Sequence, residues 1–182
     1  MPRLYLVRHG KAAAGWDSDP DPGLDDLGRS QAAVVADEFD SIGPLPLVTS
    51  PLRRTRETAA ALERHWGVVA RIEPRIAEIP SPITDLRARG AWLAAAMQGS
   101  WDALEPIVQD WRHHLIEALL DCAEDTILVT HFIAINAAVG RALGEDRVVC
   151  FRPENGSISV IETAGRQLRL IERGSEGASK VL

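Results

Sequence analysis

The sequence predicts an α/β fold: a three-layer sandwich in which a mostly parallel central sheet is flanked by helices, with a small helical cap insertion. Short apolar segments alternate with longer amphipathic ones, and strand–helix alternation of this kind builds parallel sheets. The strand pattern lapses between about residues 80 and 124, where two helical stretches follow one another. With 182 residues, of which 46% are hydrophobic, the chain can bury one good core but hardly two. A single domain over residues 1–182 is therefore expected.

The first half of the chain alternates predicted strands with predicted helices. Continuous apolar runs that stop at polar residues are typical of buried strands, and apolar residues near helical spacing predict the helices. Turn formers fill the loop from Gly15 to Gly23. At Ser50-Pro51 an N-cap residue is followed by proline at the first helical position. The expected elements are strands at 4–7, 45–49 and 68–72, a helix from about 27 to 42, and a helix from Ser50 to about His65.

The second half holds the cap and the closing part of the sheet. Pro80 and Pro82 break the chain at the start of the cap, which we place at about 80–124. Asn155-Gly156 and Ala164-Gly165 are turn signals, and the tail over 174–182 is expected to be frayed. The expected elements are helices at 86–97, 101–120 and 133–143, and strands at 126–130, 148–151, 157–162 and 167–172.

Composition and spacing disfavour several classes of protein. The net charge of -6 is ordinary, so neither nucleic acid nor an anionic membrane is expected as a partner. Cys122 and Cys150 lie outside any CxxC or Cys/His spacing, which favours free thiols over a disulfide or a zinc site. His113 and His114 point to different faces of a helix, so a metal site formed with His65 is not expected. The sequence shows no signal-peptide or membrane-spanning apolar run, and a cytoplasmic location is expected.

Polar residues of one chemical kind follow three of the predicted strands. In open α/β sheets ligands bind at the carboxyl ends of the strands, so residues far apart in the sequence meet there. Two histidines and at least two arginines at one such edge indicate a phosphate pocket. The three groups are Arg8-His9, Ser50 with Arg53 and Arg54, and Thr130-His131.

Three arginines stand where a helix disfavours them. Arg53, Arg54 and Arg56 lie in the first two turns of a predicted helix, where the macrodipole favours acidic side chains. A bound anion at this helix N-terminus would offset the repulsion, although for Arg56 a solvated surface position is the better interpretation. Gly10, directly after His9, lacks a Cβ where the backbone would approach a ligand closely.

Four segments resemble, in order, the motifs of the histidine phosphatase (phosphoglycerate mutase-like) superfamily. An Arg-His-Gly triplet alone is a weak motif, but four motifs in the family's order are specific. The resemblance covers roughly residues 3 to 143, the catalytic core, and leaves the cap unspecified. The segments are Leu6-Val7-Arg8-His9-Gly10, Leu27-Gly28-Arg29-Ser30-Gln31-Ala32, Ser50-Pro51-Leu52-Arg53-Arg54-Thr55-Arg56-Glu57-Thr58-Ala59 and Val129-Thr130-His131.

The resemblance implies a role for each matching residue. His9 would be the nucleophile, Glu78 the proton donor and His131 a further catalytic residue. Neighbouring cations disfavour protonation of an imidazole, so Arg8 and Arg54 would keep His9 neutral. The implied phosphate-binding residues are Arg8, Arg54, His131 and Gly10, with Lys11, Ser50 and Arg53 as secondary contacts. No step of this chemistry calls for a metal or a cofactor.

The sequence also departs from parts of the family pattern. Lys11 stands where many members carry Glu or Gln, and Gly15 stands where the mutases have a substrate-binding Asn, which disfavours mutase activity. The segment Arg8–Ala12 is similar to the small phosphohistidine phosphatases. Phe132 follows His131, where the acid phosphatase branch has aspartate and the mutases glycine, and we expect it to narrow the pocket.

The favoured function is hydrolysis of a phosphomonoester, or of a phosphohistidine on a protein, through a covalent intermediate on His9. Two alternatives stay open: a phosphoglycerate mutase-type phosphotransferase, and a regulatory module that binds phosphate without turnover. A mere binder would need neither the nucleophile His9 nor the acid Glu78, which favours the enzyme. The expected partner is a phosphorylated small molecule or a phosphohistidine protein, and the sequence leaves its identity and the oligomeric state open.

Overall fold

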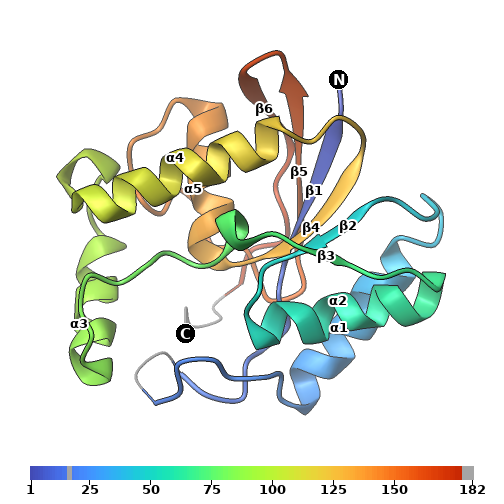
Figure 1. The fold of residues 1–182 in the computed structure, drawn as a ribbon, viewed down its shortest axis with the longest axis horizontal. Coiled ribbons are helices and arrows are strands. Elements are labelled where there is room, and N and C mark those ends of the chain that lie inside the picture. The colour runs from blue at the N-terminus through green and yellow to red at the C-terminus, as the bar shows by residue number, and fades with distance from the viewer. Residues whose placement is uncertain (16–17, 178–182) are drawn as a thin grey trace.

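The computed structural model describes residues 1–15 and 18–177, which fold around one mixed sheet (Figure 1). The strands are β1 (Arg3–Arg8), β2 (Leu47–Thr49), β3 (Arg71–Ile72), β4 (Thr126–Thr130), β5 (Ile158–Ala164) and β6 (Gln167–Glu172). Their order in the sheet is β3-β2-β4-β1-β5-β6. The first four strands pair in parallel, whereas β5 and β6 run antiparallel to their neighbours. The predicted α/β class with a mostly parallel sheet is confirmed.

Helices cover both faces of the sheet, which confirms the predicted three-layer sandwich. The helices are α1 (Asp26–Glu38), α2 (Arg53–Trp66), α3 (Leu86–Ala96), α4 (Pro106–Leu120) and α5 (Phe132–Leu143). Because side chains alternate along a strand, β1 contributes to two cores. Leu4 and Leu6 join the core built with α4 and α5, whereas Tyr5 and Val7 join the core built with α1 and α2. In Figure 1 the pair α1 and α2 lies below the strands, opposite α4.

The register of the sheet brings three strand ends together. Strand β4 lies between β1 and β2. Arg8 at the end of β1 pairs with Thr130 at the end of β4, and Thr49 at the end of β2 pairs with Val129. The segments that follow these three strands therefore leave the sheet at one edge, where the sequence analysis expected a ligand.

The cap is helical, as predicted, but its second part is built differently. Helix α3 stands apart from the sheet, at the left of Figure 1. The predicted continuous helix over 101–120 is wrong: a single 3₁₀ turn at Trp101–Ala103 is followed by extended Leu104 and Glu105, and α4 begins at Pro106. Proline is favourable at the first helical position, where its missing N–H is not needed, but it would break a helix that ran through it.

The start of α2 also differs from the prediction. Ser50 and Pro51 do not form its N-cap and first turn, because the helix begins at Arg53, after an extended Leu52 whose side chain makes no cap. Ser50 Oγ instead lies 2.8 Å from His131 Nε2. The Ser50 hydroxyl group, which the local pattern predicted as the N-cap of α2, thus makes a tertiary contact with His131.

The predicted strand at 148–151 is wrong as well. The backbone N–H groups of Cys150 and Phe151 donate to Asn136 Oδ1, at 2.9 and 3.1 Å, so a side chain of α5 satisfies them and no neighbouring strand is needed. Strand β3 covers only the last two residues of the predicted 68–72.

The C-terminal segment is held in place, so the predicted frayed tail is wrong for residues 174–177. Glu154 N–H donates to Ser175 O at 2.8 Å, and Gly177 N–H donates to Arg152 O at 3.2 Å. The residues after Gly177 lie outside the described part of the chain. The two cysteines are free, as predicted, and no helix in the described ranges is long and apolar enough to cross a membrane.

Two glycines allow the segment after β1 to cross the start of α1. A Cβ built on Gly10 would lie 2.3 Å from Gly28 O, and a Cβ on Gly28 would lie 2.1 Å from Lys11 O. Both clashes are with backbone atoms, which cannot rotate away. Gly10 is therefore required by the packing of two backbone segments, whereas the sequence analysis explained it by approach to a ligand.

We expect Gly28→Ala to lower the free energy of unfolding by roughly 1–3 kcal/mol, because overpacking outweighs the small gain in helix propensity. Gly99→Ala is the matched control, since its new Cβ would have no atom nearer than Ala96 O at 3.5 Å. Urea unfolding followed by circular dichroism measures both variants. Equal stability of the two would contradict the close contact between the segments.

Candidate active site

His9 follows β1 directly and presents an unprotonated nitrogen inside the protein. Its side chain is 3% exposed. Nδ1 lies 2.7 Å from Gly10 O, and because a carbonyl oxygen can only accept, Nδ1 carries the proton and donates. Nε2 is therefore unprotonated, and Arg54 Nε donates to it at 3.2 Å.

The protein keeps His9 uncharged. Burial holds the pKa of His9 well below its ordinary value, and the positive charges of Arg54 and Arg8 lower this pKa further. The hydrogen bond to Gly10 O opposes the shift and is the smallest of the four effects. The side chain is thus in the protonation state that a nucleophile requires.

Arg54 lies in the first turn of α2 and points inward. Its side chain is 1% exposed, and within the described residues its Nη1 and Nη2 atoms are buried without a hydrogen-bond partner. Burial lowers the pKa of this guanidinium group, and the charge of Glu78 partly opposes that effect. Buried charged donors without acceptors are unfavourable on their own, and such donors are suited to an anion.

Arg8 is the second buried guanidinium group, and a later loop holds it. Its Nη1 donates to Pro153 O at 2.8 Å, and its Cζ lies 5.1 Å from the centre of the Phe132 ring. Burial lowers the pKa of Arg8 to about 10, against the opposing charges of Glu78 and Glu154. Phe132 is itself packed into the core, so its ring supports the arginine.

His131 follows β4 and completes the buried group. Its side chain is 0% exposed, and the centres of the His9 and His131 rings are 5.2 Å apart. Ser50 Oγ contacts Nε2 at 2.8 Å, while Nδ1 is buried without a partner in the described ranges. Burial, followed by the charge of Arg54, holds the pKa of His131 well below its ordinary value. His131 is therefore neutral in the free protein.

Glu78 follows a short 3₁₀ helix (Pro74–Ile76). Its charge acts on both Arg8 and Arg54, although all three residues come from different parts of the sequence. Its side chain is 8% exposed, and Oε1 accepts from Ile79 N–H at 3.0 Å. Burial raises the pKa of Glu78, and the hydrogen bond from Ile79 N–H and the arginine charges oppose the shift without reversing it. A carboxyl group with a raised pKa is suited to general acid catalysis.

Two predicted secondary contacts lie outside this buried group. Lys11 Nζ pairs with Asp25 Oδ2 at 2.9 Å, and the lysine side chain is 51% exposed. Arg53 Nε pairs with Glu57 Oε1 at 2.7 Å on the exposed side of α2. The third, Ser50, is buried and contacts His131.

Two supporting residues were not identified from the sequence. Asn155 Nδ2 donates to His9 O at 3.0 Å, and Thr58 Oγ1 accepts from Gly10 N–H at 3.0 Å and donates to Arg54 O at 2.8 Å. Thr58 lies in the Ser50–Ala59 family motif, so the sequence did contain a pattern that could have identified it. The sequence around Asn155 indicates a turn and nothing more.

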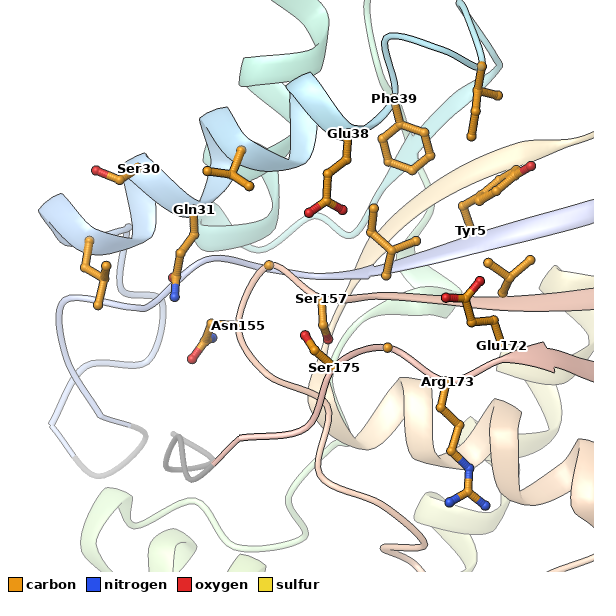
Figure 2. A pocket seen from close by; sticks show the side chains of 17 residues that line it. Tyr5, Ser30, Gln31, Glu38, Phe39, Asn155, Ser157, Glu172, Arg173 and Ser175 are labelled. Atoms are coloured by element: carbon orange, nitrogen blue, oxygen red, sulfur yellow. The ribbon is translucent and has the colours of Figure 1, made fainter.

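A separate groove of about 620 Å³ lies between α1 and the strands β5 and β6 (Figure 2). Asn155 and Ser157 line it from the loop that supports His9, and Gln31 lines it from α1. Neither His9 nor Arg54 belongs to its lining. The groove is therefore distinct from the buried polar group.

Comparison with known proteins assigns the family. A model described as the histidine phosphatase superfamily (branch 1) matches residues 4–175. The chain belongs to this superfamily. It is thus a histidine phosphatase, a member of a metal-independent class of hydrolases that act through a phosphohistidine, and the predicted family and enzyme class are confirmed. In the described part of the chain, no group of His, Cys, Asp and Glu side chains is arranged to hold a metal ion.

Individual relatives of this histidine phosphatase carry both phosphatase and mutase names. A glucosyl-3-phosphoglycerate phosphatase of Mycolicibacterium vanbaalenii is 29% identical over 170 residues, covering 89% of this chain and 73% of the relative. A probable phosphoglycerate mutase of Cronobacter sakazakii is 27% identical over 165 residues, covering 79% and 76%. A mycobacterial glucosyl-3-phosphoglycerate phosphatase solved with VO3 superposes with a TM-score of 0.73 at 24% identity, over 97% of this chain and 100% of the other. That structure supports the fold alone.

We expect Arg54→Met to raise the pKa of His9, because the substitution removes the larger of the two charges that lower it. The pKa should stay below its ordinary value, since burial is the largest cause and remains. Titration of the His9 ring followed by NMR measures the change. Arg53→Met is the matched control, because Arg53 is exposed and paired with Glu57. A His9 pKa that is unchanged in Arg54→Met would contradict the arrangement.

Proposed function

We propose that this histidine phosphatase hydrolyses a phosphomonoester, or a phosphohistidine on a protein, through attack of His9 Nε2 on phosphorus. One observation carries the proposal: three buried nitrogens, Arg54 Nη1, Arg54 Nη2 and His131 Nδ1, have no partner in the described residues, and they accompany a buried imidazole whose Nε2 is unprotonated. Unused donors around a nucleophile match a tetrahedral anion that is held while it is attacked.

The proposed donors suit the charge that develops during transfer. Phosphoryl transfer spreads negative charge over three equatorial oxygens, so most of the catalysis is positioning and electrostatic stabilisation. Arg8 and Arg54 stay charged, and a planar guanidinium group is suited to holding phosphoryl oxygens. Each charge-assisted hydrogen bond is worth roughly 1.5–3 kcal/mol. Gly10 serves the site indirectly, by letting the backbone beside His9 pack closely.

Glu78 is proposed as the proton donor. As the bond from phosphorus to the leaving oxygen breaks, the protonated carboxyl group gives its proton to that oxygen, and phosphorus becomes bonded to His9 Nε2. The ionised Glu78 then takes a proton from water, whose oxygen attacks phosphorus and releases inorganic phosphate and free His9. The raised pKa of Glu78 supports this role.

Hydrolysis is favoured over mutase chemistry. Gly15 stands where the mutases have a substrate-binding Asn, and Lys11 stands where many family members carry Glu or Gln. The Lys11 side chain forms an exposed ion pair outside the buried group. The substrate is proposed as a phosphorylated small molecule or a phosphohistidine protein, acted on by one domain over residues 1–182. The cytoplasmic location stays a prediction from the sequence.

His9→Ala should lower turnover of an aryl phosphate to below about one thousandth of wild type, because the covalent intermediate cannot form. Wild-type activity should survive EDTA. His65→Ala is the matched control, since His65 lies at the exposed end of α2 beside Asp40. Labelled substrate quenched in alkaline detergent should leave a phosphoenzyme on wild type that is stable in alkali and labile in acid. A phosphoenzyme that forms equally on His9→Ala would rule out this nucleophile.

Glu78→Gln should slow alkyl phosphates by about 10²–10⁴-fold and p-nitrophenyl phosphate far less, because a good leaving group needs no proton. Wild-type activity on alkyl phosphates should fall as the pH rises through the pKa of Glu78, since the acid form is then lost. Glu73→Gln is the control, because Glu73 is as buried as Glu78 but accepts hydrogen bonds from Arg71 and Arg75. Equal slowing of both substrates in Glu78→Gln would place the acid elsewhere.

A further inference from the structure

The two buried histidines differ in the contacts that their ring nitrogens make with the protein. His9 donates from Nδ1 to Gly10 O and leaves Nε2 unprotonated. His131 contacts Ser50 Oγ through Nε2 and leaves Nδ1 without a partner in the described ranges. A neutral imidazole carries one proton, so His131 can donate from Nδ1 only if Nε2 is unprotonated.

The hydrogen bonds around Ser50 decide between the two tautomers. Leu52 N–H donates to Ser50 Oγ at 3.2 Å. If His131 Nε2 also donated to this oxygen, the Ser50 hydroxyl hydrogen would be buried with no acceptor among the described residues. If Nε2 is unprotonated, the hydroxyl group donates to it and accepts from Leu52, so that all three groups are satisfied. Buried donors without acceptors are disfavoured, which favours the second arrangement.

Ser50 is held in a fixed position relative to His131. Its N–H donates to Val129 O at 3.1 Å, on the strand that ends just before His131. Thr55 Oγ1 donates to Ser50 O at 3.0 Å and ties the same residue to the start of α2. The Ser50 side chain is 0% exposed, so water does not compete for its hydroxyl group. The hydroxyl group is therefore placed by two elements of the fold.

We propose that Ser50 is a positioning residue that fixes neutral His131 as the Nδ1–H tautomer, so that an uncharged histidine still donates a hydrogen bond to the phosphoryl group. The bond made by one ring nitrogen sets the role of the other, as it does for histidines in metal sites. The inference rests on the proposed function only for the identity of the acceptor. The tautomer itself is a property of the free protein.

The neutral Nδ1–H form of His131 provides a hydrogen-bond donor without a further positive charge in the site. A cationic His131 could donate from both nitrogens without help, but it would add a third positive charge beside Arg8 and Arg54. Burial and those charges already favour the neutral form. With the proton on Nδ1, the neutral ring still offers a donor, and its bond to an ionised phosphoryl oxygen is charge-assisted.

Long-range nitrogen–proton NMR of protein labelled at the histidine ring nitrogens tests the proposal, since it separates the Nδ1–H, Nε2–H and doubly protonated forms. In wild type without phosphate near neutral pH, we expect His131 as the Nδ1–H form. Ser50→Ala should move the population toward Nε2–H. Thr126→Val is the matched control: it removes a buried hydroxyl group that donates to Glu124 O at the start of β4, at the other end of that strand from His131, and should leave the tautomer unchanged. His131→Asn assigns the resonances.

Turnover gives a second measurement. Ser50→Ala should lower kcat/KM about 10- to 100-fold, the loss expected for one charge-assisted hydrogen bond, whereas Thr126→Val should stay near wild type. An Nε2–H or doubly protonated His131 in wild type overturns the proposal, as does a tautomer that is unchanged in Ser50→Ala. The wild-type spectrum decides even if that variant does not fold. Failure of the proposed function would appear separately, as a missing phosphoenzyme on His9, and would leave the tautomer result intact.

Discussion

The burial of the Arg54 guanidinium group is the constraint on which the rest of the site depends. Its side chain is 1% exposed, and its two terminal nitrogens lack partners in the described residues. Burying a charged group without a partner is costly, and further positive charge nearby would add to the cost. The same charge lowers the pKa values of His9 and His131. Burial is the larger cause of the neutral histidines that the proposed chemistry needs, and the arginine that would hold the phosphoryl group reinforces it.

Glu78 is subject to opposing effects in the same environment. Burial raises its pKa, whereas the charges of Arg54 and Arg8 lower it, and burial is the larger effect. A dianionic phosphate between the arginines would offset their influence and disfavour a second negative charge nearby. Binding of the substrate would therefore favour the protonated carboxyl group at the moment an acid is needed. Once the proton has left, the ionised form is available as a base.

The sequence predicted the parts of the fold and site that follow from strands, and missed those held by tertiary contacts. His9 and His131 come directly after β1 and β4, and sheet topology brings these strand ends together whatever the loops do. The bond from Asn155 to His9 O spans 146 residues, and the local pattern shows only a turn. Ser50 differs from its predicted role for the same reason, because its partner His131 lies 81 residues further along the chain. The wrong strand at 148–151 has a similar cause, a side-chain oxygen on α5.

The loop at residues 152–157 and the segment at residues 175–177 carry no family motif, but they hold Arg8 in place. Arg8 N–H donates to Ser157 O, Gly156 N–H donates to Arg8 O, and Arg8 Nη1 donates to Pro153 O, so this loop fixes both the backbone and the side chain of Arg8. The loop is in turn hydrogen-bonded to residues 175–177. These hydrogen bonds connect Arg8, at the end of β1, to the loop, and the loop to residues 175–177. The buried site therefore depends on segments that span the chain from β1 to residue 177. The family match to residue 175, well beyond the motif-bearing residues 3–143, is consistent with that dependence. Residues outside the motifs thus fix the backbone of Arg8 and His9, which belong to a motif.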